Sequence, residues 1–243
     1  MEPVRLIFPL EDRSILAGLE AGEKVLVSGT IYTARDAAHA RLVEELAKAR
    51  REAGNARAHG AGAQAPWSGS DGVEHAGGEA SQLLADVSRV SAEAQRDFGE
   101  ERRSGGEEGP RSRDEAQLLP FPPGSCIYYA GPAMTRDGRI TAIGPTTASR
   151  MDTFAPVLYE WGVAATLGKG PRAKEVAEAC RAYGAVYLVT YGGAASYLAS
   201  FVRKATCVAY RDLGPEAIYR LEVEDFPAYV GIDTRGHVFP ALP

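Results

Sequence analysis

Residues 24–50 read KVLVSGTIYTARDAAHARLVEELAKAR, and the pattern of apolar residues changes halfway along this stretch. Residues 24–32 are rich in valine and isoleucine, which favours a β-strand. Residues 36–50 place their apolar side chains at helical spacing instead. Those side chains are Ala37, Ala38, Leu42, Val43 and Leu46. A strand that leads directly into an amphipathic helix predicts an α/β fold.

The same alternation returns in the second half of the chain. Strands are predicted over 125–130, 163–167, 185–190, 205–210, 218–223 and 228–233, and helices over 147–161, 172–183 and 192–200. Pro156 is expected to kink the first of these helices or to end it early. The predicted class is therefore α/β throughout both flanks.

Between the flanks the composition changes near Arg51 and changes back near Gln117. Residues 52–116 contain Trp67 and Phe98 but no isoleucine, methionine, tyrosine or cysteine. Such a segment cannot bury enough apolar surface to offset the entropy of its chain. We predict one domain formed by residues 1–51 and 117–243. Residues 52–116 are predicted to be a disordered low-complexity insert, with a short amphipathic helix within it over 81–97.

Bulk properties exclude several classes of protein. The 243 residues carry a formal net charge of −5 with a pI of about 5.5, which argues against a nucleic-acid-binding domain. The three cysteines are widely spaced and the four histidines form no metal-ligand pattern. The N-terminus has no signal-peptide pattern and no apolar run is long enough to span a membrane. We expect a cytoplasmic protein with no metal ligands of its own.

Three segments place a cation or a hydroxyl where a strand or loop meets a helix. Arg35 lies at the entrance of the helix 36–50, where Thr33 or Asp36 can cap the free N–H groups and an anion is favoured. This arginine would hold a carboxylate, or it would pair with a nearby acid at the surface. Lys169 lies between two glycines after a strand, where it can approach a ligand or simply occupy a turn.

The third segment is GPTTASRMD, residues 144–152. A Gly-Pro turn before two threonines predicts a helix start. If the helix begins there, Thr146 and Arg150 share a face, and the guanidinium could bind a carboxylate through two hydrogen bonds. The alternative is a threonine cap beside an exposed arginine. Taken together, the three segments suit a small dianion such as a dicarboxylic acid.

The motif GTIYTARDAAH at 29–39 resembles a hallmark of the class I, iron–sulfur-dependent fumarate hydratases, in their C-terminal domain or separate β subunit. Further segments also resemble motifs of this family, and they occur along the chain in the same order as in the family. They lie at 127–132, 144–152, 167–170, 192–194, 212–217 and 223–227. The resemblance covers nearly everything except the insert. It implies a swivelling β/β/α domain.

The resemblance also implies roles for particular residues and for a partner. Arg35, Arg150 and Lys169 match residues that grip the substrate carboxylates, and Thr146 matches a threonine assigned to proton transfer. The [4Fe-4S] cluster of the family is held by three cysteines of an α part. The resemblance therefore implies that an α subunit supplies the cluster in a hetero-oligomer acting on fumarate and (S)-malate.

The sequence also allows two other functions. The β subunit of an L(+)-tartrate dehydratase resembles the fumarase part and runs the same elimination on a dihydroxy acid. The complete YTxRDAAH spacing makes us favour fumarase. A dicarboxylate-binding module without catalytic activity is the alternative outside the enzymes.

Overall fold

The computed structural model describes residues 2–60 and 119–240, with side chains described for 2–49 and 119–240. The chain divides into two compact units. The first combines Met1–Ala40 with Glu108–Pro243, and the second is Arg41–Glu107. The folded architecture described below belongs to the first unit.

A seven-stranded sheet is the framework of this unit, in the order β1-β2-β3-β6-β7-β9-β8. The strands are β1 (Val4–Phe8), β2 (Lys24–Thr33), β3 (Cys126–Tyr128), β6 (Ala165–Gly168), β7 (Val186–Val189), β8 (Val202–Ala209) and β9 (Ile218–Ile232). Strands β1, β2, β3, β6 and β7 run parallel to one another, whereas β8 and β9 are antiparallel to their neighbours. A separate two-stranded sheet joins β4 (Ala133–Met134) to β5 (Ile140–Ala142).

The long strand β9 closes the sheet on itself. It pairs with β7 on one side and also with β2, from Lys24 opposite Tyr229 to Tyr32 opposite Arg220. Strands β2, β3, β6, β7 and β9 therefore form a small barrel-like closed sheet. Inward side chains of these strands are fully buried in one core, which includes Val27, Tyr128, Leu188, Phe226 and Val230.

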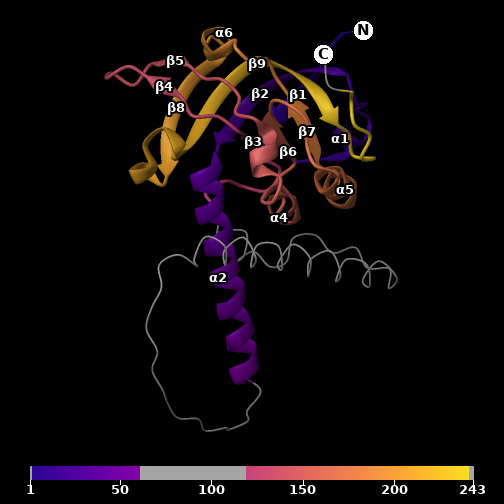
Figure 1. Ribbon diagram of the computed structural model, residues 1–243, viewed down its shortest axis with the longest axis vertical. Coiled ribbons are helices and arrows are strands. Elements are labelled where there is room, and N and C mark those ends of the chain that lie inside the picture. The colour runs from indigo at the N-terminus through magenta and orange to yellow at the C-terminus, as the bar shows by residue number, and fades with distance from the viewer. Residues whose placement is uncertain (1, 61–118, 241–243) are drawn as a thin grey trace. The chain divides into compact units, whose positions relative to one another are not determined.

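Helices occupy both sides of the sheet (Figure 1). Helices α4 (Ala155–Glu160) and α5 (Lys174–Tyr183) pack against each other on one side. Helix α6 (Ala195–Ala199) packs against β5 on the other side. Gly184 ends α5 in the left-handed conformation, which glycine adopts without steric cost. The other helical elements of the described residues are α1 (Ser14–Ala17), the 3-10 turns η2 (Ala148–Met151) and η3 (Arg211–Glu216), and α2 (Asp36–Gly60), which begins in the first unit and continues into the second.

The prediction of a mixed α/β fold is confirmed, although several details differ and β1, β4 and β5 were not predicted. The single helix predicted over 147–161 is wrong, because η2 and α4 are separate elements and Pro156 lies in the first turn of α4. The two strands predicted over 218–223 and 228–233 form one strand, β9, with Asp225 in a positive-φ conformation inside it. Helix α2 continues beyond the predicted end at residue 50 to Gly60. The helix predicted at 81–97 lies outside the described residues.

Candidate functional site

The sequence-predicted site residues gather at one edge of the parallel strands. Arg35 follows the end of β2, and Lys169 directly follows the end of β6. The amide of Thr146 donates to the Tyr129 carbonyl at 2.6 Å, immediately after the end of β3. The carboxyl ends of parallel strands lie at the same edge of a sheet, where α/β proteins commonly bind ligands. The structure therefore brings these segments together.

Arg35 is held by an acid that lies far away in the sequence. Its terminal nitrogen is 3.2 Å from Glu216 Oε1, and both side chains are about one-quarter exposed, at 27% and 28%. Glu216 Oε2 accepts the Ala37 amide of the first turn of α2 at 3.2 Å. Glu216 therefore holds the Arg35 side chain in place. It also accepts a hydrogen bond from an amide in the first turn of α2 that has no partner within the helix. Among the described residues, nothing accepts a hydrogen bond from the buried Nε of Arg35.

This arrangement corrects the predicted helix cap. The Thr33 hydroxyl lies 3.4 Å from the Ala217 carbonyl and accepts the Tyr219 amide at 3.0 Å, so it joins β2 to the start of β9. The Asp36 carboxylate turns to Arg150 instead of capping its own helix. Glu216 can approach this closely because Gly131 has no side chain, since a Cβ there would lie 2.4 Å from the Pro215 carbonyl oxygen.

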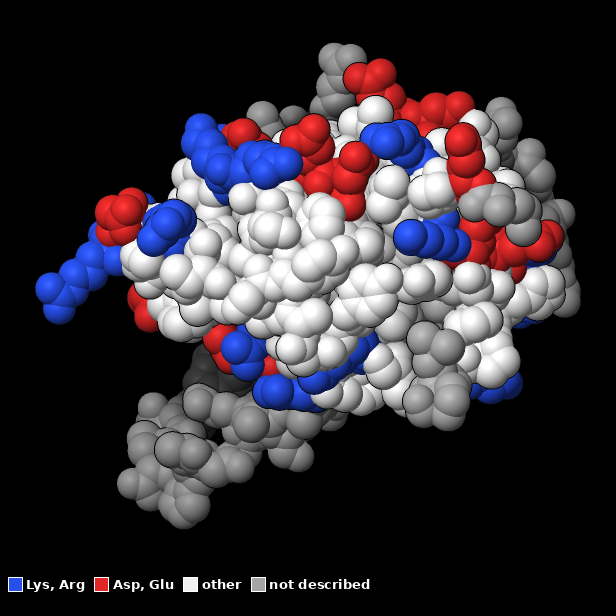
Figure 2. Space-filling view, turned by 90° about the horizontal axis from the view of Figure 1, so that it is seen from above, with Lys and Arg blue, Asp and Glu red and all other residues white. Residues whose placement is uncertain are grey.

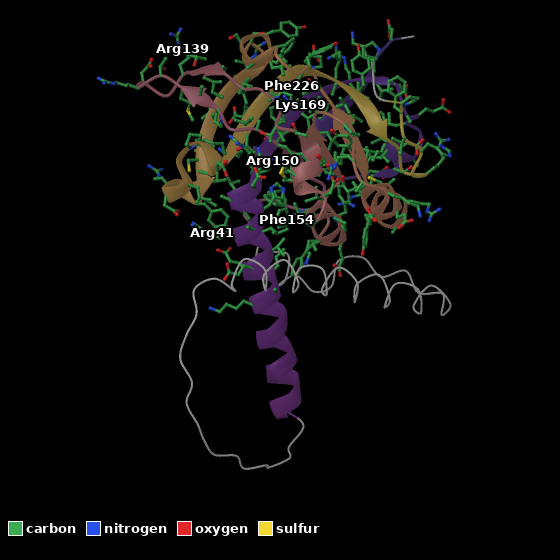
Figure 3. All side chains as sticks on the ribbon, viewed as in Figure 1. Arg41, Arg139, Arg150, Phe154, Lys169 and Phe226 are labelled. Carbon is green, nitrogen blue, oxygen red and sulfur yellow. The ribbon has the colours of Figure 1, made fainter. Side chains whose placement is uncertain are left out.

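Arg150 forms a two-point pair with Asp36. Nε donates to Oδ1 at 2.9 Å and NH2 lies 2.9 Å from Oδ2. The arginine side chain is 52% exposed, and Figure 3 labels it together with Lys169. A planar guanidinium has a second edge that can bind another carboxylate in the same way. Asp36 thus occupies one edge of Arg150 and leaves the terminal edge available to a ligand.

Thr146 and Arg150 do not share a helical face, contrary to the sequence argument. Helical geometry begins at Ala148, and Thr146 precedes it. The Thr146 carbonyl instead accepts the Lys169 amide at 3.3 Å, and the Lys169 carbonyl accepts the Ala148 amide at 2.8 Å. The two segments therefore run side by side, and this backbone pairing relates Thr146 to Lys169.

Lys169 makes no ion pair with any other residue for which side chains are described. Its side chain lies against Gly192, where an added Cβ would be 3.3 Å from Cδ of the lysine. The absent side chain at Gly192 gives the lysine stem room to extend. The glycine turn after β7 therefore has a packing role that positions a cation.

His39 lies buried beneath Arg35. Its Nδ1 is 2.8 Å from the Arg35 carbonyl, and its ring packs against Tyr129 and Phe154. Burial lowers the pKa of His39 to about 4, against a weaker opposing effect of that hydrogen bond. The ring is therefore neutral at physiological pH, and the neutral form that donates from Nδ1 fits the contact.

A buried ion pair lies next to these residues and was not anticipated from the sequence. Arg172 is 0% exposed and pairs with Asp152, which is 14% exposed. Its guanidinium also lies 5.3 Å from the Tyr129 ring centroid and 4.8 Å from that of Tyr187. Asp152 ends the motif at 144–152 and Arg172 follows the segment 167–170, but no local pattern in the sequence marks the two as partners.

The cysteines do not fit an iron–sulfur cluster. Cys126 on β3 and Cys180 on α5 are buried, and Cys207 lies on β8. Burial raises the pKa of Cys126 far above its usual range and that of Cys180 to about 12, which disfavours the thiolate that ligates iron. Within residues 2–49 and 119–240, no three His, Cys, Asp or Glu side chains are grouped as metal ligands.

The face that carries α6 has an uncharged centre with acidic and basic side chains around it (Figure 2). Tyr191 and Tyr197 are exposed aromatic residues after β7 and on α6, and the Tyr191 hydroxyl is 3.2 Å from that of Tyr229. Tyr191 directly precedes Gly192, so apolar surface borders the candidate site. In the described parts of the chain, no helix has the length and apolar character needed to cross a membrane.

Comparisons with known proteins show which family the sequence resembles. A family profile described as Fumarase C-terminus matches residues 4–55 and 113–241. Fumarate hydratase 2 of Leishmania major is 43% identical over 128 residues, which are 51% of this chain and 22% of that protein. The aerobic class I fumarate hydratase of Escherichia coli K12 is 45% identical over 116 residues, 46% of this chain and 21% of that enzyme.

A shorter relative is matched along most of its length. The protein named "Putative L(+)-tartrate dehydratase subunit beta" of Methanocaldococcus jannaschii is 39% identical over 145 residues, 52% of this chain and 74% of that protein. The chain thus spans about a fifth of the fumarate hydratases above but about three-quarters of this subunit.

Proposed function

The chain belongs to the fumarase C-terminus family, and from this premise we propose that it is the β part of a class I hydro-lyase that interconverts fumarate and (S)-malate. One observation carries the proposal. Segments bearing Arg35, Arg150 and Lys169 meet at the carboxyl edge of the parallel strands, beside Thr146. Three cations and one hydroxyl carried by these segments would suit a small dicarboxylate.

In the proposed site the two arginines and the lysine hold the substrate carboxylates. The outer edge of Arg150 would take one carboxylate through two hydrogen bonds, while Asp36 keeps the guanidinium plane oriented. Arg35 and Lys169 would supply charge to the carboxylates from two other strand ends. Fixing both ends of a four-carbon acid would orient the carbon atoms between them for reaction.

The chemistry explains why cations are needed here. Dehydration of malate removes a weakly acidic proton next to a carboxylate, and negative charge then spreads onto that group. Cations already aimed at the carboxylate stabilise this charge more in the transition state than in the ground state. We propose that the Thr146 hydroxyl transfers the proton, a role that requires neighbouring groups to activate it.

We further propose that a separate α subunit supplies the [4Fe-4S] cluster in a hetero-oligomer. The poor fit of Cys126, Cys180 and Cys207 to a cluster supports this division. The swivelling of the β part against its partner, which the family resemblance implies, belongs to the same proposal.

Tartrate dehydration is the second candidate function. The observation in its favour is the 39% identity over 145 residues to the Methanocaldococcus protein, of which 74% is aligned. The site as described would suit either acid, because both substrates present two carboxylates. The distinction must therefore come from turnover.

The deciding experiment is co-expression with a candidate α subunit followed by anaerobic assay. We expect hydration of fumarate and dehydration of malate to exceed turnover of L(+)-tartrate. The isolated chain should be inactive with all three acids. Faster turnover of tartrate would favour the second candidate, and strong activity of the isolated chain would refute the two-subunit proposal.

The domain boundaries also remain a proposal. We propose that residues 1–51 and 117–243 form the family domain and that 52–116 are an insert outside the site. The gap in the family match between residues 55 and 113 supports this division. Deleting residues 54–113 should preserve malate dehydration in the assembled enzyme, and loss of α-subunit binding by the deletion variant would show a docking role.

A further inference from the structure

The Asp152–Arg172 ion pair is almost completely buried, with side-chain exposures of 14% for Asp152 and 0% for Arg172. Arg172 Nε donates to Asp152 Oδ1, and the Ala173 amide donates to Oδ2 at 2.8 Å. Both carboxylate oxygens are therefore engaged by one short stretch of chain. The rings of Tyr129 and Tyr187 flank the guanidinium.

The position of this pair connects two segments of the candidate site. Asp152 lies two residues after Arg150, and Arg172 lies three residues after Lys169. At their other ends the same segments are joined by backbone hydrogen bonds between Lys169 and both Thr146 and Ala148. The segments 146–152 and 169–173 are therefore fastened together at two points.

A third contact stabilises the lysine segment between these points. The Tyr187 hydroxyl donates to the Gly170 carbonyl at 2.9 Å. The backbone around Gly170 is thus fixed by a hydrogen bond from β7 as well as by the contacts of Asp152. Any displacement of Asp152 would be transmitted to Arg172 and, through three residues, to Lys169.

Burial of an ion pair is weak evidence for a role in stability, because removal from water offsets much of the attraction. Arginine at such a position provides directional hydrogen bonds and a flat face for aromatic rings, which lysine cannot reproduce. These properties fix geometry, and the geometry fixed here is the separation between the segments carrying Arg150 and Lys169.

We propose that Asp152 and Arg172 form a positioning clamp that sets the spacing of the cations at Arg150 and Lys169, and hence the fit of a dicarboxylate between them. This inference rests on the proposed function. Neither clamp residue touches the substrate in this arrangement, and both act through the segments that they join.

The first test measures the clamp itself in the full chain, without any substrate. Asp152→Glu and Arg172→Lys both keep the charges but change the reach or the shape of the pair. Amide hydrogen exchange should speed up at least about tenfold at both Ala148 and Lys169 in either variant. Glu178→Gln, which breaks the exposed Lys174–Glu178 pair of α5, is the control and should leave both amides unchanged.

The second test uses the assembled enzyme under anaerobic conditions. Each clamp variant should raise KM for malate about fivefold or more, with a smaller change in kcat. The reason is that the carboxylates of bound malate would be held less tightly in the ground state. Lys169→Met should also raise KM. The double variant with Lys169→Met and Asp152→Glu should have a KM close to that of Lys169→Met alone, because the clamp acts partly through Lys169.

The outcomes separate the two proposals. Unchanged exchange at Lys169 in both variants would overturn the clamp, whatever the activity. Faster exchange with an unchanged KM, or fully additive effects with Lys169→Met, would overturn its role in positioning the site. If the wild-type assembly turned over neither malate nor tartrate, the proposed function would fail while the exchange measurement still decided whether the two segments are coupled.

Discussion

Asp36 binds Arg150 along one edge of the guanidinium group, with both contacts at 2.9 Å. The two residues lie 114 positions apart in the chain. The pair joins the first residue of α2 to the 3-10 turn η2. Its geometry implies that Asp36 orients the guanidinium of Arg150 and that a ligand can bind the terminal edge of that group.

Asp36→Asn should weaken catalysis without unfolding the protein. The amide can accept from Nε but cannot form the charged two-point pair, so Arg150 would sample more orientations. We expect kcat/KM for malate to fall about tenfold, or about 1.4 kcal/mol. Because exposed ion pairs stabilise proteins by at most about 1 kcal/mol, Tm should change little. Steady-state kinetics and thermal melts measure the two effects, and a normal kcat/KM would contradict an orienting role.

Arg150→Lys keeps the charge but loses the planar fork. We expect kcat/KM to fall by more than about tenfold, because a lysine cannot hold a carboxylate through two parallel hydrogen bonds. Melting temperature and binding of the α subunit should stay near wild type. The assay should use limiting malate under anaerobic conditions. Near-normal kinetics would remove Arg150 from the site, whereas a parallel loss of stability would assign it a structural role.

Two substitutions of Glu216 distinguish the effect of its ion pair with Arg35 from the effect of its hydrogen bond with the Ala37 amide. Glu216→Gln can still accept the Ala37 amide but lacks the charge that faces Arg35. Glu216→Ala loses both contacts, and loss of a helix cap typically costs about 1 kcal/mol. We therefore expect only the alanine variant to lower the unfolding free energy by that amount, while both raise KM.

Denaturant unfolding and steady-state kinetics test this separation. Glu224→Gln is a matched control, since Glu224 forms an exposed pair with Arg203 at 3.0 Å. The control should alter neither quantity. Equal stability losses in the glutamine and alanine variants of Glu216 would show that charge, and not the cap, provides the stabilisation.

His39 should make stability depend on pH in a defined window. The unfolded chain binds a proton at the ordinary pKa of 6.5, whereas burial lowers the pKa in the folded protein to about 4. Between these values the unfolded state holds more protons, so acidification favours unfolding. The contribution of His39 is fully present above pH 6.5 and is lost as pH falls towards 4, by up to about 1.4 kcal/mol per pH unit.

Comparing wild type with His39→Gln isolates this contribution. The free energy of unfolding is measured with urea at several pH values. Between pH 6.5 and about 4 it should fall more steeply with decreasing pH for wild type than for the variant. From pH 7 to 8 the two curves should run parallel, because the wild-type ring is neutral in both states. Parallel curves across the acid window would show that His39 is not the titrating group.

Local patterns predicted the main elements well. Residues 24–32 were predicted as a strand and β2 spans Lys24–Thr33, because valine and isoleucine fit a pleated, buried surface. The helix over 147–161 failed because Pro156 favours a first helical turn, which placed the start of α4 at Ala155. The closure of the sheet by β9 could not be read locally, because strand pairing depends on contacts between distant residues.

The site shows the same division between local and distant information. Motifs identified Arg35, Arg150, Lys169 and Thr146, and their roles stay predictions. Their partners could not be inferred, since Glu216 lies 179 residues from the amide that it accepts. A single acid at the end of a short 3-10 turn has no periodicity that marks it as the partner of a particular arginine. Its function becomes visible only when the fold brings the two together.

The closing strand β9 also has a consequence for how the protein is made. During synthesis β2 leaves the ribosome long before β9, yet the two pair along most of β2. Until translation has passed Ile232, the nascent chain therefore exposes an unpaired strand edge, which is prone to association with other chains. Glu216 lies two residues before the start of this strand, so the residue that pairs with Arg35 is also translated late. The Arg35–Glu216 ion pair can therefore form only after nearly all of the described strands have been translated.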